Sequence, residues 1–151
     1  MQFNLTPGKM SFNGKTRVLF VCIGNACRSP MGEAIARKEA GDVIEALSAG
    51  LYPMGVIPEL TQSTLEQNGY SASGLRSKGL REIAAEDIDL VVNLSGYERA
   101  QALEKYEAIE NWEVPDPYGA DEATYQRILE DIRGRVRELA QRLREAQRAA
   151  R

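Results

Sequence analysis

Residues 17–34, RVLFVCIGNACRSPMGEA, constrain the fold more than any other part of the chain. The segment contains a run of four consecutive apolar residues, 18–21, and the first and last residues of this run are β-branched. Such a run is typical of a strand that is buried on both faces, as strands of parallel sheets are. Ser29 and Pro30 then predict a helix start, with Ser29 as the N-cap and Pro30 at the first helical position. The segment therefore predicts a strand, a short loop and a helix.

Apolar runs and helical patterns alternate along the rest of the chain. The further strands are expected at residues 43–50, 88–94 and, with a weaker pattern, 108–114. The helices are expected at residues 30–41, 58–69, 78–85, 97–106 and from residue 122 onwards. This alternation predicts an α/β fold, here a single-domain four-stranded parallel sheet flanked by helices on both faces. We expect the domain to occupy residues 16–151, after a flexible N-terminal extension at residues 1–15.

The composition excludes several classes of protein. No stretch approaches the ~20 apolar residues that span a bilayer, and the N-terminus has no apolar signal core. We therefore expect a cytoplasmic protein that does not bind a membrane. The chain has no histidine, which excludes Ser-His-Asp and Cys-His catalysis and most zinc sites. Its two cysteines are too few for a disulfide framework. We expect no metal and no cofactor.

The C-terminal segment, residues 132–151, is basic, with seven arginines and two glutamates. A basic tail can bind nucleic acid, but no aromatic residue is interleaved with these arginines as a stacking platform. We therefore expect a solvated face of a terminal helix and no nucleic-acid partner. Apolar residues at spacings of three and four predict that the other face packs on the sheet. They are Tyr125, Ile128, Ile132, Val136, Leu139 and Leu143.

The loop after the first strand has the residues of an oxyanion site. Cys22 ends that strand, and ligands of open parallel sheets bind at the carboxyl ends of strands. Gly24 and Asn25 tolerate left-handed backbone conformations, and Arg28 has a planar fork that binds two oxygens. The following helix N-terminus adds partial positive charge. We expect a phosphate-binding loop, with phosphate, sulfate or arsenate as ligand. Its backbone N–H donors are expected from Ile23, Gly24, Asn25, Ala26, Cys27 and Arg28.

The same positive field favours the reactive thiolate of Cys22 without a histidine. The Ser29 hydroxyl can hydrogen-bond this thiolate and favour it further. A thiolate beneath a bound phosphate ester can attack phosphorus and form a cysteinyl-phosphate. Asp116 lies between two prolines in VPDPYG and can act as general acid and then as base. Tyr118 is near enough in sequence to line the mouth of the site and contact an aromatic substrate.

Over residues 17–143 the chain resembles the low molecular weight protein tyrosine phosphatases. The resemblance rests on VLFVCIGNACRSPMGEA, with SAG at residues 48–50 and DPYG at residues 116–119. It implies that Cys22 is the nucleophile, that Arg28 binds the phosphoryl group and stabilises its transition state, and that Asp116 is the general acid. The implied activity is hydrolysis of protein phosphotyrosine or a small aryl phosphate, by a monomer or weak dimer.

The resemblance also implies supporting roles. Asn25 holds the loop in a strained backbone geometry, with Ser48 as its hydrogen-bond partner. Ser29 favours the thiolate and eases its departure. Cys27 matches a second loop cysteine that forms a reversible disulfide with the nucleophile and protects it from over-oxidation.

The substrate pocket departs from the family pattern. Tyr118 is followed by Gly119, where many members have a second aromatic residue. The segment after the second strand also lacks the tryptophan that some members use as a pocket wall. We expect Leu51 and Tyr52 to take its place.

Arsenate reductases with the same fold and loop are the main alternative. Thioredoxin-coupled members have further cysteines after the third strand, whereas this chain reads VVNLSGYE there, with Ser95. A three-cysteine relay is therefore impossible, but reduction through a small thiol or through Cys27 stays open. A non-catalytic oxyanion-binding module is a third reading, and it would need neither the thiolate nor Asp116.

Overall fold

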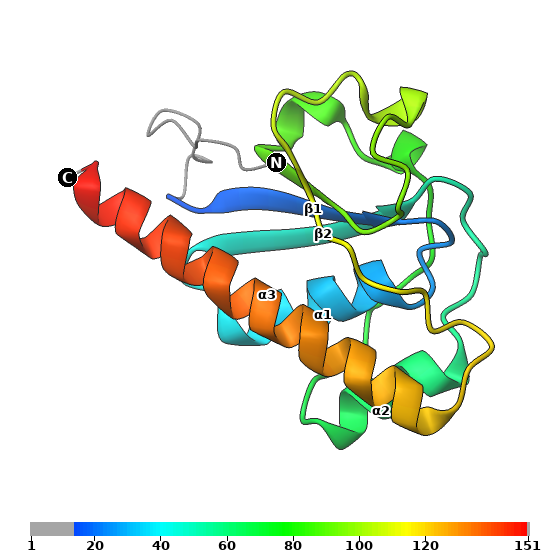
Figure 1. Cartoon of the computed structure of the whole chain (residues 1–151). Helices are drawn as coiled ribbons and strands as arrows, with labels where there is room; N and C mark the ends of the chain where they lie inside the picture. The colour runs from blue at the N-terminus through cyan, green and yellow to red at the C-terminus, as the bar shows by residue number, and fades with distance from the viewer. Residues whose placement is uncertain (1–13, 151) are drawn as a thin grey trace.

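Four strands form one parallel sheet in the computed structural model, which describes residues 14–150. The predicted extension at residues 1–15 therefore lies almost wholly outside the described residues. The sheet order is β2-β1-β3-β4, and Figure 1 shows its neighbouring strands β1 and β2. The strands are β1 (Thr16–Cys22), β2 (Ile44–Gly50), β3 (Leu90–Asn93) and β4 (Ile109–Asn111). The predicted single-domain parallel sheet is confirmed, with shorter third and fourth strands than the sequence suggested.

Side chains of β1 alternate between two hydrophobic clusters, one on each face of the sheet. Phe20 and Cys22 belong to the cluster that contains the helices α1 (Arg28–Glu39), α2 (Glu59–Gln67) and α3 (Glu122–Ala149). Leu19 and Val21 belong to the opposite cluster. That second face is covered by the chain that includes the short 3₁₀ helices η1 (Leu80–Glu82), η2 (Ala85–Asp87) and η3 (Gln101–Leu103) (Figure 1). Cys22 therefore ends β1 on the α-helical face.

The helix α1 packs very closely on β1. A Cβ atom added to Gly32 would lie 2.6 Å from the ring of Phe20. Only glycine allows this approach. The helix N-terminus is thereby held directly beside the end of β1, where Cys22 lies.

Two expected helices are wrong. Residues 97–106 contain only η3, because side chains upstream hold the backbone in a turn: Asn93 Nδ2 donates to Tyr97 O (3.1 Å) and Tyr97 N donates to Ser95 Oγ (3.1 Å). Such side-chain bonds compete with helix formation. Residues 78–85 form η1 and the start of η2 rather than one α-helix. The predicted N-cap is also wrong, because Cys27 is the N-cap of α1 and Ser29 lies inside the helix.

The long helix α3 follows the sequence prediction. All six residues of its predicted apolar stripe are buried in the core. Its arginines pair with carboxylates of the body of the domain: Arg137 with Glu39, Arg142 with Glu110 (2.6 Å) and Arg144 with Asp42 (2.8 Å). Much of the basic charge of this helix is thus neutralised within the molecule. No helix among residues 14–150 is long and apolar enough to cross a membrane.

Candidate active site

The β1–α1 loop, residues 23–27, directs its carbonyl groups to neighbouring segments. The contacts are Tyr52 N to Ile23 O (2.8 Å), Met54 N to Gly24 O (2.8 Å), Ser77 Oγ to Gly24 O (3.0 Å) and Thr61 Oγ1 to Ala26 O (2.8 Å). Within residues 14–150, no hydrogen bond uses a backbone N–H of residues 23–28 as donor. These N–H groups at the N-terminus of α1 therefore remain available to an anion.

Asn25 holds this loop in shape. It has φ +48°, in the left-handed region that non-glycine residues rarely adopt, and it is fully buried. Its Nδ2 donates to Ser29 Oγ (2.7 Å) and Ser48 Oγ (3.0 Å), and its Oδ1 accepts from Lys78 N (2.9 Å). Strained backbone persists where the surroundings over-determine it, and three bonds do so here. Of the two residues that tolerate this conformation, Gly24 does not use it, because its φ lies outside the left-handed region.

The loop passes closely over the end of β2, and this approach requires a glycine there. The sequence does not by itself explain this glycine. A Cβ atom at Gly50 would lie 2.7 Å from Asn25 N and 2.8 Å from Ile23 O. Both contacts are with backbone, which cannot move aside as a flexible side chain can. The signal in the sequence was a glycine at the very end of an expected strand.

Cys22 and Ser29 are in direct contact at the base of the loop. The Cys22 Sγ and Ser29 Oγ atoms are 2.9 Å apart, and both residues are buried. Ser29 Oγ accepts from Asn25 Nδ2, and its O–H hydrogen can reach either the sulfur at 2.9 Å or Ala49 O at 3.5 Å, of which the sulfur is the nearer. The expected Cys22–Ser29 and Asn25–Ser48 contacts are thus both present.

Arg28 ties the loop to the ends of β3 and β4. Its side chain is 5% exposed, and Nη1 donates to Leu94 O (2.6 Å) and Val114 O (3.1 Å). Among the described residues, nothing accepts a hydrogen bond from its buried Nε. A buried donor without a partner is rare in proteins, and a bound oxyanion would satisfy it.

Asp116 lies beside Arg28, 88 residues further along the chain. The Asp116 Oδ2 atom is 3.5 Å from Arg28 Nη2, and Oδ1 accepts from Tyr118 N (3.1 Å). The Asp116 side chain is 45% exposed, in contrast to the buried guanidinium. It is therefore reachable both from the loop and from solvent, as a group that exchanges protons with water must be.

One cavity of about 310 Å³ joins these groups. Its lining includes Cys22, Arg28 and Asp116, with Tyr52, Met54 and Tyr118. Tyr52 and Tyr118 are well exposed and lie at the mouth, as expected of pocket residues. Leu51 is not part of this lining, which corrects its place in the predicted pocket; it lines a neighbouring cavity together with Tyr52. Met54 is not marked by any pattern in the sequence, where it is one of several apolar residues of a loop.

A buried carboxylate extends the polar network behind the loop. Glu33 of α1 is 3% exposed, accepts from Ser48 Oγ (2.5 Å) and forms an ion pair with Arg37. Ser48 in turn accepts from Asn25, which donates to Ser29. A continuous chain of hydrogen bonds therefore links Glu33 to Ser29, which contacts the Cys22 sulfur. The sequence does not predict this role of Glu33, because the link forms only when α1 packs on β2.

Cys27 lies in the same cavity, and both cysteines are free thiols. Its Sγ is 3.4 Å from Tyr125 Oη of α3. Burial raises the pKa of the Cys27 thiol, more than its contacts with Thr61 and Tyr125 lower it. Burial and the neighbouring Cys27 also raise the pKa of Tyr125. The disulfide between Cys22 and Cys27 stays a prediction.

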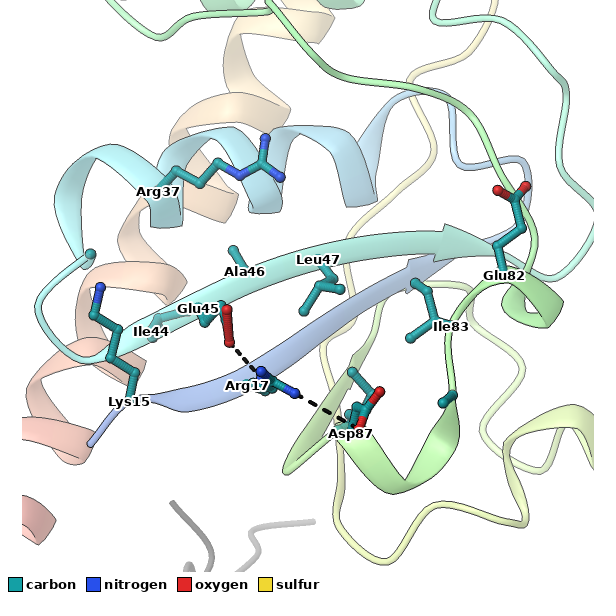
Figure 2. A pocket seen from close by; sticks show the side chains of 13 residues that line it. Lys15, Arg17, Arg37, Ile44, Glu45, Ala46, Leu47, Glu82, Ile83 and Asp87 are labelled. Atoms are coloured by element: carbon teal, nitrogen blue, oxygen red, sulfur yellow. Dashed lines mark hydrogen bonds and ion pairs between the residues drawn. The ribbon is translucent and has the colours of Figure 1, made fainter. Parts of the chain in front are cut away.

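Another cavity, of about 600 Å³, lies along the amino-terminal part of β1 and β2, away from the loop (Figure 2). Three of its charged side chains pair with each other: Arg17 contacts Glu45 (2.5 Å) and Asp87 (3.9 Å). Its lining includes neither cysteine. The described residues also contain no group of three or more His, Cys, Asp or Glu side chains that could hold a metal ion. The β1–α1 loop is therefore the better candidate for oxyanion chemistry.

Comparison with known proteins agrees with this geometry. The sequence model of the family "Low molecular weight phosphotyrosine protein phosphatase" matches residues 17–149. The chain belongs to this family, which is a family of enzymes that includes both phosphatases and arsenate reductases.

The similar proteins divide between these two activities. Arsenate reductase 1 of Bacillus cereus is 30% identical over 129 residues, which are 84% of this chain and 96% of that protein. The low molecular weight protein-tyrosine-phosphatase YfkJ of Bacillus subtilis is 34% identical over 124 residues, covering 67% of this chain and 80% of that protein. A solved arsenate reductase in the phosphate binding state has a TM-score of 0.77 at 27% identity. The match covers 85% of this chain and 98% of that chain. Fold and family are thus shared by two different reactions.

Proposed function

We propose that this protein hydrolyses phosphate monoesters through a cysteinyl-phosphate intermediate, with protein phosphotyrosine as its substrate. The observation that carries the proposal is the meeting of Cys22, Arg28 and Asp116 on one cavity, with Asp116 Oδ2 3.5 Å from Arg28 Nη2. A simple oxyanion binder needs neither a thiol at the base of the loop nor a half-exposed carboxyl at its mouth. Such a pair is what nucleophilic displacement with acid catalysis requires.

In the first step, the phosphoryl oxygens accept from the N–H groups of the loop and from Arg28. The Cys22 thiolate attacks phosphorus, an S–P bond forms, and the ester P–O bond breaks. Asp116, protonated, gives its proton to the leaving phenolate oxygen. In the second step, water attacks phosphorus, Asp116 takes its proton, the S–P bond breaks, and inorganic phosphate leaves. Ser29, 2.9 Å from Cys22 Sγ, stabilises the thiolate before the first step and after the second.

The aromatic mouth supports an aryl ester as substrate. Tyr52 and Tyr118 are both well exposed and both line the cavity. Aromatic side chains pair favourably with another ring in edge or offset arrangements. A phosphotyrosine would place its ring between these side chains while its phosphate occupies the loop.

Arsenate reduction is the second candidate, and the names of several similar proteins favour it. In that reaction Cys22 would bond to arsenic with loss of an arsenate oxygen as water, and Cys27 would then attack Cys22, so that the S–As bond breaks, a disulfide forms and arsenite leaves. Two thiols would be oxidised as As(V) is reduced to As(III), and an external thiol would restore them. The buried Cys27, whose thiol pKa is raised, weighs against a fast second step.

Two assays on the same preparation separate the reactions. We expect the protein to hydrolyse p-nitrophenyl phosphate without added metal and in the presence of a chelator, and Cys22→Ser to abolish turnover. Arsenate with glutathione and glutaredoxin should not be consumed at a comparable rate. A protein that is inert on the ester but converts arsenate to arsenite would overturn the proposal in favour of the reductase.

A further inference from the structure

Exposed apolar side chains gather around the candidate active site. Among residues 14–150, the large hydrophobic side chains that are exposed are Tyr52, Met54, Val56, Tyr97 and Tyr118. They come from the three segments that follow β2, β3 and β4, at the carboxyl edge of the sheet. Elsewhere on the described surface, large apolar side chains are at least partly covered. A gathering of this kind indicates a surface that another molecule covers.

A second hollow adjoins the catalytic cavity. It has a volume of about 930 Å³ and is lined by residues 51–52 and 96–102; we call it the side cavity. Tyr52 lines both cavities, so a molecule that leaves the catalytic cavity past Tyr52 enters the side cavity. Its far wall carries the exposed ring of Tyr97 and the charged Arg99.

The wall that carries Tyr97 is preformed. Buried Asn93, at the end of β3, donates to Tyr97 O (3.1 Å) and to Asn111 Oδ1 of β4 (2.9 Å). Ser95 Oγ accepts from Tyr97 N (3.1 Å) and donates to Asn93 Oδ1 (2.7 Å). A surface that is ordered before binding loses less conformational entropy on contact. The bonds that prevent a helix at residues 97–106 therefore also hold the backbone that carries this ring at the wall of the side cavity.

We propose that the side cavity binds the polypeptide on one side of the phosphorylated residue, and that it accepts an apolar or aromatic side chain between Tyr52 and Tyr97. This inference rests on the proposed phosphatase function. Phosphate, arsenate and small aryl esters fit within the catalytic cavity of about 310 Å³ and have no part that reaches residues 97–102. A protein substrate held by its phosphate must continue past the mouth, where Tyr52 leads to the side cavity.

The test compares three substrates on wild type and Tyr97→Ala. They are p-nitrophenyl phosphate, a phosphotyrosyl peptide with leucine and phenylalanine beside the phosphotyrosine, and the same peptide with glycines at those places. We expect Tyr97→Ala to lower kcat/KM about three- to tenfold for the apolar peptide only, the loss of one ring contact. Tyr97→Phe keeps the ring and should retain wild-type rates on all three.

Binding gives an independent readout. In the Cys22→Ser background, which does not turn over, Tyr97→Ala should weaken binding of the fluorescently labelled apolar peptide by a similar factor. Equal kcat/KM of wild type and Tyr97→Ala on the apolar peptide, or equal losses on all three substrates, would overturn the side-cavity proposal alone. A wild-type protein that is inert on p-nitrophenyl phosphate and on both peptides would instead overturn the phosphatase function on which it rests.

Discussion

At the scale of single residues, the site depends on which hydrogen-bond partner each polar group behind the loop has. Ser29 shows this best: its oxygen accepts from Asn25 and lies 2.9 Å from the Cys22 sulfur. The sequence predicted the Ser29–Cys22 contact correctly but gave Ser29 a second task, the N-cap of α1, that Cys27 has instead. Ser29 is already the second residue of the helix, so its hydroxyl lies beside the sulfur rather than at the N-cap position.

The role of Asp116 as general acid can be tested at the scale of a single residue. If it protonates the leaving oxygen, Asp116→Asn should lower kcat/KM by ~10²–10⁴-fold for phenyl phosphate, whose leaving group is a strong base. The loss should be much smaller for p-nitrophenyl phosphate, whose leaving group departs without a proton. A series of substituted phenyl phosphates measures this dependence directly. An equal loss across the series would remove Asp116 from the acid role and leave it only the contact with Arg28.

At the scale of elements, the loop is shaped by the packing of α1 and β2 on β1. Gly32 lets α1 approach Phe20, and Gly50 lets the loop cross the end of β2. Between them, Glu33 of α1 and Ser48 of β2 connect to Asn25 of the loop. The helix and the strand thus act as a frame for the loop, and its geometry depends on contacts between elements that are distant in sequence.

Glu33 therefore has a testable positioning role. Glu33→Ala leaves the Ser48 hydroxyl without its acceptor, which costs about 1–3 kcal/mol for a buried group. Because Ser48 orients Asn25, we expect kcat on p-nitrophenyl phosphate to fall about tenfold, the equivalent of about 1.4 kcal/mol. Glu33→Gln still offers an oxygen to Ser48 and should retain most of kcat.

A double-mutant cycle is the control for Glu33. Glu33→Ala combined with Ser48→Ala should be no slower than Ser48→Ala alone, because both changes break the same link. Purely additive losses of kcat would mean that Glu33 supports the protein without acting on the loop through Ser48.

At the scale of the whole molecule, α3 covers the core and carries the basic charge. Its buried stripe packs in the cluster that contains Cys22 and Cys27, while its arginines pair with carboxylates at the end of α1, in the turn that follows it and in β4. The helix contributes Tyr125 to the surroundings of Cys27 but no residue to the lining of the catalytic cavity. We expect its main contribution to be stability.

Ile132, which is fully buried in α3, tests this contribution. Ile132→Ala should lower the free energy of unfolding by about 2–5 kcal/mol, through lost apolar burial and the cavity left behind. Urea denaturation measures the change, and kcat of the folded variant should stay near the wild-type value. The exposed Gln141→Ala on the same helix should change stability by less than about 0.5 kcal/mol. Equal losses for both variants would contradict the proposed role of the buried face.

The sequence alone determined the strand, loop and helix around Cys22 and Arg28, and the apolar stripe of α3. These features are local: a buried run, a helix start and a helical spacing are visible in neighbouring residues. The helices expected at residues 97–106 and 78–85 are reduced to short 3₁₀ helices, and at residues 97–106 side-chain contacts such as Asn93 to Tyr97 outweigh local preference.

Tertiary structure alone decided which distant residues meet. The parallel order β2-β1-β3-β4 brings the segments after four strands to one edge of the sheet. That arrangement puts Asp116 beside Arg28 and brings Tyr52 and Tyr97 to the lining of one cavity. No spacing in the sequence reports such contacts, because they depend on strand order and on how closely helices pack on the sheet. The physical reason is that a nucleophile can be recognised from its local turn, whereas the groups that surround it are assembled by the fold.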